Sequence, residues 1–408
     1  MTALAQTPVR KIVRAISDAA ERWSDADFPP RVRVTDRIAE RTGYSVPVVE
    51  YALDRLFFSI TVDELEATIR GELGSLEILD DFAARTGRPD AYAAPVGSVC
   101  VISSRTTIGV AVVPAVFALC AKCDVVVKDR EDSLVRAFFD SLAEELEPFA
   151  QAARANAWSS SDTDAPDLSA FEAVVAFGAD DTLSAISSRM RPGARFIGYG
   201  SRASAGYVAR EVLSDRTAAA AIARGAARDL VLYESEGCLS LHVLFVERNA
   251  ALSLQDFGAL LAAALEEANV EFPICRRDEG AIAAISHLRN VAAFRAAGGN
   301  GAVFANENAD YAVIVDQPPS EPPPFLPRTI GIIAVDGPDD ALAYLRAHGV
   351  LLEAFALSGD RADLVRGAVE AGAVRLARFG ELQHPLVSGD HGGRPRIAEF
   401  IRWIDKSL

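Results

Sequence analysis

A cysteine beside a glycine is the residue of this chain best suited to nucleophilic chemistry. Cys238 stands in the segment Glu236-Gly-Cys-Leu-Ser240, directly before an apolar run that predicts a strand at 241–246. The missing glycine side chain lets backbone and substrate approach the sulfur closely. The thiolate is the reactive species, so such a site has to lower the pKa of the cysteine through helix termini, cations or backbone donors. By residue type alone, a buried cysteine at a strand start is the competing interpretation.

The other cysteines predict packing rather than chemistry. Cys100 lies within an apolar run, and Cys275 precedes two arginines but no further site feature. Cys120 and Cys123 form a C-x-x-C pair without the additional cysteines or paired histidines that a tetrahedral zinc site needs, so we expect no metal. An odd, sparse set of five cysteines argues against a disulfide framework and for a reducing compartment, and we expect a cytoplasmic protein.

Composition excludes several classes of protein. The 408 residues, half of them hydrophobic, exceed one ordinary domain and predict two connected domains. The formal net charge is −16 without a basic cluster, which speaks against nucleic acid as a partner. No apolar run reaches the ~20 residues that span a bilayer, so we expect no membrane span. The first residues predict an amphipathic helix and no export leader.

Strands alternate with helices along most of the chain. Apolar runs predict strands at 98–102, 125–127, 173–177, 195–198, 241–246, 302–304, 311–315, 329–335 and 351–356, with helices at 109–121, 132–149, 217–230 and 254–268. Such alternation is typical of parallel sheets covered by helices on both faces, which predicts the α/β class. Ligands of such sheets bind at the carboxyl ends of the strands, where Lys128, Gly178 and Gly200 stand.

Both ends of the chain predict helices. The first 90 residues have helical periodicity, and Thr61 with Glu64 forms a capping box. This part carries no obvious chemistry, so we expect it to pack against the next domain. Residues 394–406 predict an amphipathic helix, and six prolines within 318–327 predict an extended connection.

The succession of these segments resembles the aldehyde dehydrogenase superfamily, and it is most similar to the LuxC-like fatty acyl-CoA reductase branch. The resemblance covers roughly residues 90 to 408 and rests on order rather than on one motif. The segments that carry it are 94–109, 114–128, 171–201 and 236–240, with 378–384, 390–393 and 401–405 towards the end of the chain.

This resemblance implies an aldehyde dehydrogenase-like fold with two Rossmann-like α/β domains and an N-terminal helical segment. The segment would comprise residues 1–90 and pack on a nicotinamide cofactor-binding domain at 91–232. A catalytic domain at 233–380 would carry Cys238, and a tail at 381–408 would return to the cofactor domain. The family also implies a homo-oligomer.

The cofactor residues that the resemblance implies lie at the strand ends. The lysine matching Lys128 reaches the adenosine ribose or its 2′-phosphate. Glu131 stands where the family often has a glutamate that binds the ribose hydroxyls, which favours NADH, whereas Arg130 could hold a 2′-phosphate and so favours NADPH. The branch favours NADPH, with NADH as the alternative. Gly178 could present backbone N–H groups to the pyrophosphate, although Asp180 would repel it if it faced that anion.

The segment 171–201 ends in a glycine turn, whose Gly200 and Ser201 we also assign to the cofactor site.

Two departures from the family stand near the residues that would carry the chemistry. Thr106 occupies the position of an oxyanion-hole asparagine and can donate one hydrogen bond. No acid occurs within 198–208, where aldehyde dehydrogenases carry the glutamate that activates water; its absence suits a reductase.

The resemblance therefore implies reduction of an acyl thioester, such as acyl-CoA, to an aldehyde. Cys238 would form an S-acyl enzyme, its backbone N–H and Thr106 would hold the oxyanion, and NADPH would deliver hydride. A partner protein could replace CoA as the acyl donor. One alternative is an NAD(P)-dependent aldehyde dehydrogenase or an acyl-phosphate reductase that forms a semialdehyde. Another is a non-catalytic scaffold or binding protein of the same fold.

Overall fold

The computed structural model describes residues 2–130, 133–159, 162, 165–299, 301–308, 310–316, 325–359 and 361–407. Glu131 and most of the proline-rich connection lie outside these ranges. The chain divides into two compact units. The first comprises Met1–Thr42, Val49–Gly200 and Leu386–Leu408, and the second comprises residues 43–48 and 201–385. The border after Gly200 lies well before the expected domain border at 232.

Four helices open the chain, as its periodicity predicts: α1 (Val9–Ser24), α2 (Pro29–Thr42), α3 (Val46–Phe58) and α4 (Val62–Leu73). Thr61 caps α4 by accepting the Glu64 N–H at 3.3 Å. Trp23 of α1 is fully buried, and its ring packs 5.0 Å from Phe57 and 6.2 Å from Phe138. Its indole N–H donates to Ser141 Oγ at 3.0 Å, which satisfies the polar atom of this core residue.

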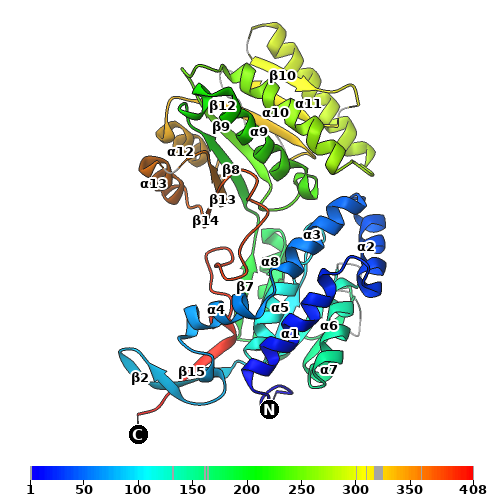
Figure 1. The fold of residues 1–408 in the computed structure, drawn as a ribbon, viewed down its shortest axis with the longest axis vertical. Helices are drawn as coiled ribbons and strands as arrows, with labels where there is room; N and C mark the ends of the chain where they lie inside the picture. Colours follow the sequence, from blue (N-terminus) through cyan, green and yellow to red (C-terminus); the bar gives the residue numbers. More distant parts are fainter. Residues whose placement is uncertain are drawn as a thin grey trace. The chain divides into compact units, whose positions relative to one another are not determined.

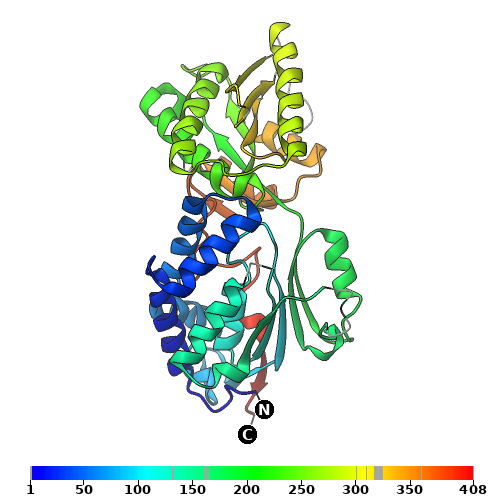
Figure 2. The ribbon, with the colours of Figure 1, turned by 90° about the vertical axis from the view of Figure 1, so that its right-hand side faces the viewer.

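A five-stranded parallel sheet forms the centre of the first unit (Figure 2). Its order is β5 (Ala153–Asn156), β4 (Asp124–Lys128), β3 (Ser98–Ile102), β6 (Ala173–Phe177) and β7 (Arg195–Tyr199). The order reverses between β3 and β6, as in doubly wound nucleotide-binding sheets. Its helices are α5 (Val112–Cys120), α6 (Leu134–Glu145), the short α7 (Phe149–Ala152) and α8 (Asp180–Ser187). This topology confirms the α/β class.

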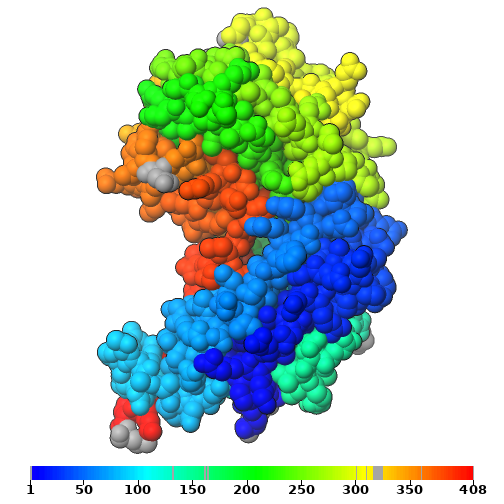
Figure 3. Space-filling view, viewed as in Figure 1, coloured from blue at the N-terminus to red at the C-terminus, as the bar shows by residue number. Residues whose placement is uncertain are grey.

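A small antiparallel sheet joins distant parts of the first unit. Strand β2 (Arg88–Pro95) pairs with β1 (Ala83–Arg85) on one side and with β15 (Ile401–Asp405) on the other. Figure 3 shows the light-blue hairpin and the red chain end together at the surface. The helix expected over 394–406 is therefore wrong. Pairing with β2 satisfies the backbone of these residues, and this partner lies some 300 residues away in the sequence, beyond the reach of a local pattern.

The second unit contains a seven-stranded sheet. Its order is β10 (Gly301–Ala305), β11 (Ala312–Asp316), β12 (Thr329–Val335), β9 (Leu241–Glu247), β8 (Ala203–Val208), β13 (Leu352–Leu357) and β14 (Arg375–Ala377). Every pairing is parallel except that of β10 with β11. Its helices are α9 (Arg216–Val231), α10 (Leu254–Glu271), α11 (Glu279–Ala297), α12 (Pro338–Ala347) and α13 (Ala362–Glu370), with α9 beside α10 (Figure 1).

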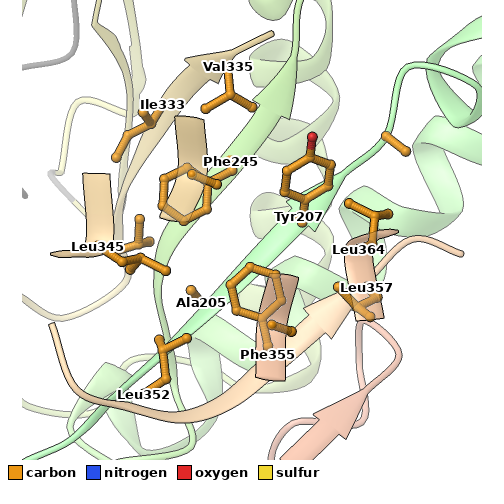
Figure 4. Close-up of a cluster of buried hydrophobic side chains, with 14 residues drawn as sticks. Ala205, Tyr207, Phe245, Ile333, Val335, Leu345, Leu352, Phe355, Leu357 and Leu364 are labelled. Atoms are coloured by element: carbon orange, nitrogen blue, oxygen red, sulfur yellow. The ribbon is translucent and has the colours of Figure 1, made fainter. Parts of the chain in front are cut away.

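The core of the second unit lies between β8, β9, β12, β13 and the helices α12 and α13 (Figure 4). Tyr207, Phe245 and Phe355 supply its large rings, each no more than 3 % exposed. Close packing of rings this size against one face of a parallel sheet makes the strand positions rigid. The segment that contains Cys238 lies at the N-terminal ends of β8 and β9.

Candidate functional site

The segment that leads into Cys238 has an unusual backbone. Residues 233–235 have φ angles of 56°, 50° and 61°, so three consecutive side-chain-bearing residues are left-handed. Each such residue costs about 1–2 kcal/mol. Strain of this kind collects at functional sites, where surrounding contacts hold it in place. The Ser240 N–H then donates to the carbonyl oxygen of Gly237 at 2.9 Å and closes a turn around the cysteine.

A buried ion-pair cluster holds this left-handed segment. Glu234 accepts hydrogen bonds from the guanidinium groups of Arg328 and Arg277, the latter at 2.9 Å between Nη2 and Oε2. Arg328 is fully buried, and its backbone N–H donates to Ser235 Oγ at 3.1 Å. Since buried charges are tolerated only when they are paired, these contacts fix the conformation of the segment.

Side chains of β8 and β9 form hydrogen bonds with the backbone of this turn. The Ser204 hydroxyl donates to the carbonyl oxygen of Cys238 at 2.8 Å. The ring of His242 contacts the Ser235 carbonyl oxygen through Nε2 at 3.0 Å and accepts the Ser204 N–H through Nδ1 at 3.4 Å. Burial lowers the pKa of His242 to about 4, so its ring is neutral near pH 7.

The thiol of Cys238 is accessible but protonated at neutral pH. The side chain is exposed, unlike the buried Cys100 in the first unit. Surrounding protein atoms desolvate the thiol enough to raise its pKa to about 12, and the charge of Glu353 acts in the same direction. The backbone N–H groups of Cys238 and Leu239 and the charge of Arg202 oppose this rise. The lowered pKa that the sequence led us to expect is therefore not found in this state.

The tail of the second unit reaches the residues after Cys238. Gln383 donates from Nε2 to Ser240 Oγ at 2.8 Å. Asp229 of α9 anchors the tail by accepting the N–H groups of Gly380 at 2.7 Å and Leu382 at 3.1 Å. Burial raises the pKa of Asp229 to about 7, against the effect of these two hydrogen bonds. The turn is thus held from both strands and from the tail.

In the first unit, cations gather at the carboxyl ends of β3 and β4. Lys128 ends β4, and Arg130 follows it. Burial and then the positive charge of Arg130 lower the pKa of Lys128, and Arg105, in the loop after β3, acts in the same direction. Burial lowers the pKa of Arg130 as well, followed by the charges of Arg105 and Arg41.

This mutual repulsion defines an electropositive region. Asp162 opposes it by raising the pKa of Lys128. The Lys128 ammonium also lies 5.7 Å from the centre of the Trp158 ring, which follows β5. Cations whose pKa values are lowered by burial and by each other are stabilised when an anion binds between them. The region can therefore hold a phosphate group beside an aromatic ring.

The glycine positions at the ends of β6 and β7 lie close together. The Gly178 N–H donates to the Tyr199 carbonyl oxygen at 3.2 Å. A Cβ at Gly200 would collide with Oδ1 of Asp180, the first residue of α8. The missing side chain makes room for this carboxylate, which stands at the N-terminus of the helix. An anion at that terminus would be repelled by the Asp180 carboxylate or would have to displace it.

The remaining predicted residues are placed as follows. Thr106 is half-buried in the loop between β3 and α5 of the first unit. Gly109 of that loop has a φ of 76°, and a Cβ there would collide with Leu56 of α3. Ser201 is exposed and opens the longer segment of the second unit, residues 201–385. Glu131 lies outside the described residues.

Other groups that could carry chemistry are buried or engaged elsewhere. Cys120 and Cys123 are buried, and burial raises the pKa of each to about 12. His391 stacks on Tyr199 at 4.2 Å between ring centres. His384 Nδ1 lies 3.4 Å from Glu381 Oε2. Within the described ranges, no group of three or more His, Cys, Asp or Glu residues could hold a metal ion, and no helix is long and apolar enough to cross a bilayer.

Sequence reasoning missed several residues of these sites. Arg41 and Arg105 join the cation cluster from the end of α2 and from the loop after β3, and no motif marks either. Glu353 and Arg202 act on the Cys238 thiol from the starts of β13 and β8. Only the fold brings these segments together.

The family model described as Acyl-CoA reductase (LuxC) matches residues 4–403. A search of curated proteins finds no match.

Solved structures of the same fold cover nearly the whole chain. Aldehyde Dehydrogenase C from Pseudomonas syringae, in complex with NAD+ and octanal, has a TM-score of 0.70 at 15 % identity, covering 98 % of this chain and 84 % of that one. Aldehyde dehydrogenase 21 from Physcomitrella patens has a TM-score of 0.69 at 13 % identity, covering 99 % of this chain and 85 % of that one. An NAD-dependent benzaldehyde dehydrogenase from Corynebacterium glutamicum has a TM-score of 0.69 at 15 % identity, covering 99 % of this chain and 87 % of that one. The aldehyde dehydrogenase-like fold is confirmed.

Proposed function

Because the chain belongs to the LuxC family of acyl-CoA reductases, we propose that it reduces an acyl thioester to an aldehyde through an S-acyl intermediate on Cys238. The family and the fold make it an oxidoreductase of acyl groups or aldehydes. The observation that carries the finer proposal is the placement of Cys238. Its thiol is exposed on a turn that follows three strained residues and is held by buried contacts. Strain held this firmly suits a nucleophile that must keep its geometry.

The first step is attack of Cys238 Sγ on the thioester carbonyl carbon. With a thiol pKa of about 12, the proton leaves as the new C–S bond forms, and the departing thiolate takes up an equivalent proton. The backbone N–H of Cys238 and Thr106 are our candidates for holding the oxyanion. The segment 198–208 lacks the glutamate that would activate water, so the S-acyl enzyme has no general base from this segment to hydrolyse it and persists until it is reduced.

A bound nicotinamide cofactor would supply the hydride that reduces the acyl group. After that transfer, the carbon–sulfur bond to Cys238 breaks, the aldehyde is released, and the thiolate recovers a proton from solvent. The doubly wound strand order and the cations at the ends of β3 and β4 fit a phosphorylated dinucleotide. Lys128 and Arg130, with Arg105, would hold a 2′-phosphate, which favours NADPH over NADH. Gly178, Gly200 and Ser201 remain our candidates for contacts to the rest of the cofactor.

The test measures NADPH oxidation with a series of acyl-CoA lengths and with an acyl phosphate. Matched variants are Cys238→Ser and Cys275→Ser, since Cys275 is the other exposed cysteine of the described residues. We expect turnover with acyl-CoA in wild type and Cys275→Ser, and none in Cys238→Ser. Turnover with acyl phosphate alone would point to the semialdehyde-forming alternative. No turnover with any donor, including a protein-bound acyl group, would leave the non-catalytic alternative.

A further inference from the structure

His242 connects both ends of the turn that carries Cys238. It lies on β9, and its ring nitrogens face two different backbone groups. Nε2 is 3.0 Å from the carbonyl oxygen of Ser235, and Nδ1 is 3.4 Å from the backbone nitrogen of Ser204. Ser204 in turn donates from Oγ to the carbonyl oxygen of Cys238 at 2.8 Å. One imidazole therefore touches the turn directly at Ser235 and through Ser204 at Cys238.

These contacts select one tautomer of the ring. A backbone carbonyl can only accept, so Nε2 carries the hydrogen, and a backbone N–H can only donate, so Nδ1 is the acceptor. A neutral imidazole of this tautomer satisfies both groups at once. Neither lysine, arginine nor a protonated imidazole could do so, because each offers donors only.

The ring is built into its place rather than left to fill space. His242 is 7 % exposed and Ser204 is fully buried. The ring of Phe325 lies 4.3 Å from that of His242, at an angle of 51°. Replacing this buried ring by an apolar group removes two hydrogen bonds and leaves both of their backbone partners unsatisfied.

The turn needs such support. Its three left-handed residues, 233–235, are strained and keep this conformation only where surrounding contacts hold them. Glu234 is held by its arginines, and Ser235 is held by His242 at its carbonyl oxygen. Without the second contact, the carbonyl of Ser235 can rotate and the strain can relax towards Cys238.

We infer that His242, as the Nε2–H tautomer, is a positioning residue that holds the Cys238 turn in the geometry needed for acyl transfer, with Ser204 as its relay. The inference rests on the proposed function, since it assigns a geometry to the nucleophile. It needs no contact between the imidazole and the substrate. The reacting atom is the sulfur of Cys238, and His242 acts on it only through the backbone.

The experiment compares His242→Leu, His242→Gln and Ser204→Ala, with His287→Leu as the control. The amide nitrogen of glutamine can reach the Nε2 position and keep the donor to Ser235, whereas leucine removes it. His287 is an exposed histidine of the same unit. The readouts are kcat and KM for acyl-CoA, the dissociation constant of NADPH, and hydrogen exchange of the backbone amides at 235–240.

We expect kcat of His242→Leu to fall about 100-fold, the size of effect that a 1 Å misplacement produces, with KM and NADPH binding unchanged. The kcat of Ser204→Ala should also fall. The kcat of His242→Gln should stay within about 10-fold of the wild-type value, which is the effect of one modest hydrogen bond. Amide exchange at 235–240 should accelerate in His242→Leu and not in the control. If His242 had a purely structural role, its loss would accelerate amide exchange in all segments alike, and glutamine would not restore kcat.

Two results overturn the inference. One is a His242→Leu variant with the kcat of wild type and unchanged exchange at 235–240. The other is a His242→Gln variant as slow as His242→Leu. If wild type itself forms no product with any acyl donor, the proposed function fails, but the exchange at 235–240 still decides whether His242 holds the turn. Should His242→Leu fail to fold, Ser204→Ala and His242→Gln carry the comparison, because both keep the volume of the site nearly unchanged.

Discussion

The guanidinium of Arg202 lies 3.6 Å from the carboxylate of Glu353, and these two side chains act in opposite directions on the thiol of Cys238. Glu353 raises the pKa of the thiol and Arg202 lowers it, while desolvation by the surrounding protein atoms contributes more than either. Burial also raises the pKa of Glu353 itself, against the charges of Arg202 and Arg375. The ion pair thus modulates how readily the nucleophile loses its proton.

Removing the charge of Glu353 should make Cys238 more reactive at neutral pH. In Glu353→Gln the pKa of the thiol falls, and each unit of fall raises the thiolate fraction about 10-fold. A less basic thiolate is a weaker nucleophile, which reduces the net gain to about threefold per unit. The measurement is the rate of Cys238 alkylation by iodoacetamide against pH, followed by peptide mass spectrometry. Arg202→Gln should shift the profile the other way.

The control for this experiment is Glu370→Gln, an exposed acid on α13 of the same unit. Its profile should match that of wild type. A Glu353→Gln profile that also matches wild type, or that moves to higher pH, contradicts the assigned direction.

Breaking the ion pair around Glu234 should destabilise the second unit. Glu234→Gln leaves Arg328 buried without its carboxylate, a change that costs about 3–5 kcal/mol when a buried pair is split. Urea unfolding measures this loss as a lower midpoint. The double variant Glu234→Gln with Arg328→Met removes the unpaired charge and should recover much of the stability. An unchanged midpoint in the single variant would show that the pair does not hold the turn.

Removing a cation from the cluster should weaken NADPH binding more than NADH binding. Arg130→Gln deletes a charge-assisted contact worth about 1.5–3 kcal/mol, or roughly 10- to 100-fold in Kd. NADH lacks the 2′-phosphate, so its Kd should change little. Fluorescence titration of both cofactors gives the ratio, and Arg189→Gln, an exposed arginine of the first unit, is the control. Equal losses for the two cofactors would argue against a phosphate site.

Stability should depend on pH through Asp229. Its pKa is raised by burial from 3.8 to about 7, so the folded protein binds a proton that the unfolded chain releases. This carboxyl therefore contributes stability that is fully present below about pH 4 and is lost as the pH rises through about 7. Relative to Asp229→Asn, wild type should lose stability between these two values. Unfolding free energies at pH 5 and pH 8 measure the difference, and a constant difference would contradict the raised pKa.

The strands with continuous apolar runs could be predicted closely from the sequence. The expected bounds of β3, β6 and β12 agree with the structure, because buried parallel strands consist of little but apolar residues. Strand β8 was not predicted, since Ala-Ser-Ala-Gly-Tyr-Val has small residues and a weak pattern. The sequence predicts a helix where β15 lies, because the partner strand β2 is remote in the sequence and leaves no local pattern.

The site could be predicted only where one segment carries it. Cys238 is a candidate because the order of segments resembles the family and a glycine and a strand flank it, and Lys128 is a candidate because it ends a strand. The left-handed run at 233–235 could not be expected, because Tyr, Glu and Ser rarely adopt that conformation and glycine or asparagine would have signalled it. Arg41 and Arg105 come from separate segments and share only the fold.

The most direct test of the account is the mass of the intact protein after incubation with acyl-CoA in the absence of any nicotinamide cofactor. Without hydride, the intermediate should accumulate, and peptide mapping should place one acyl group on Cys238 in wild type and in Cys275→Ser. Addition of NADPH should then discharge it as aldehyde. An unmodified protein, or an acyl group that persists in Cys238→Ser, would contradict the central claim.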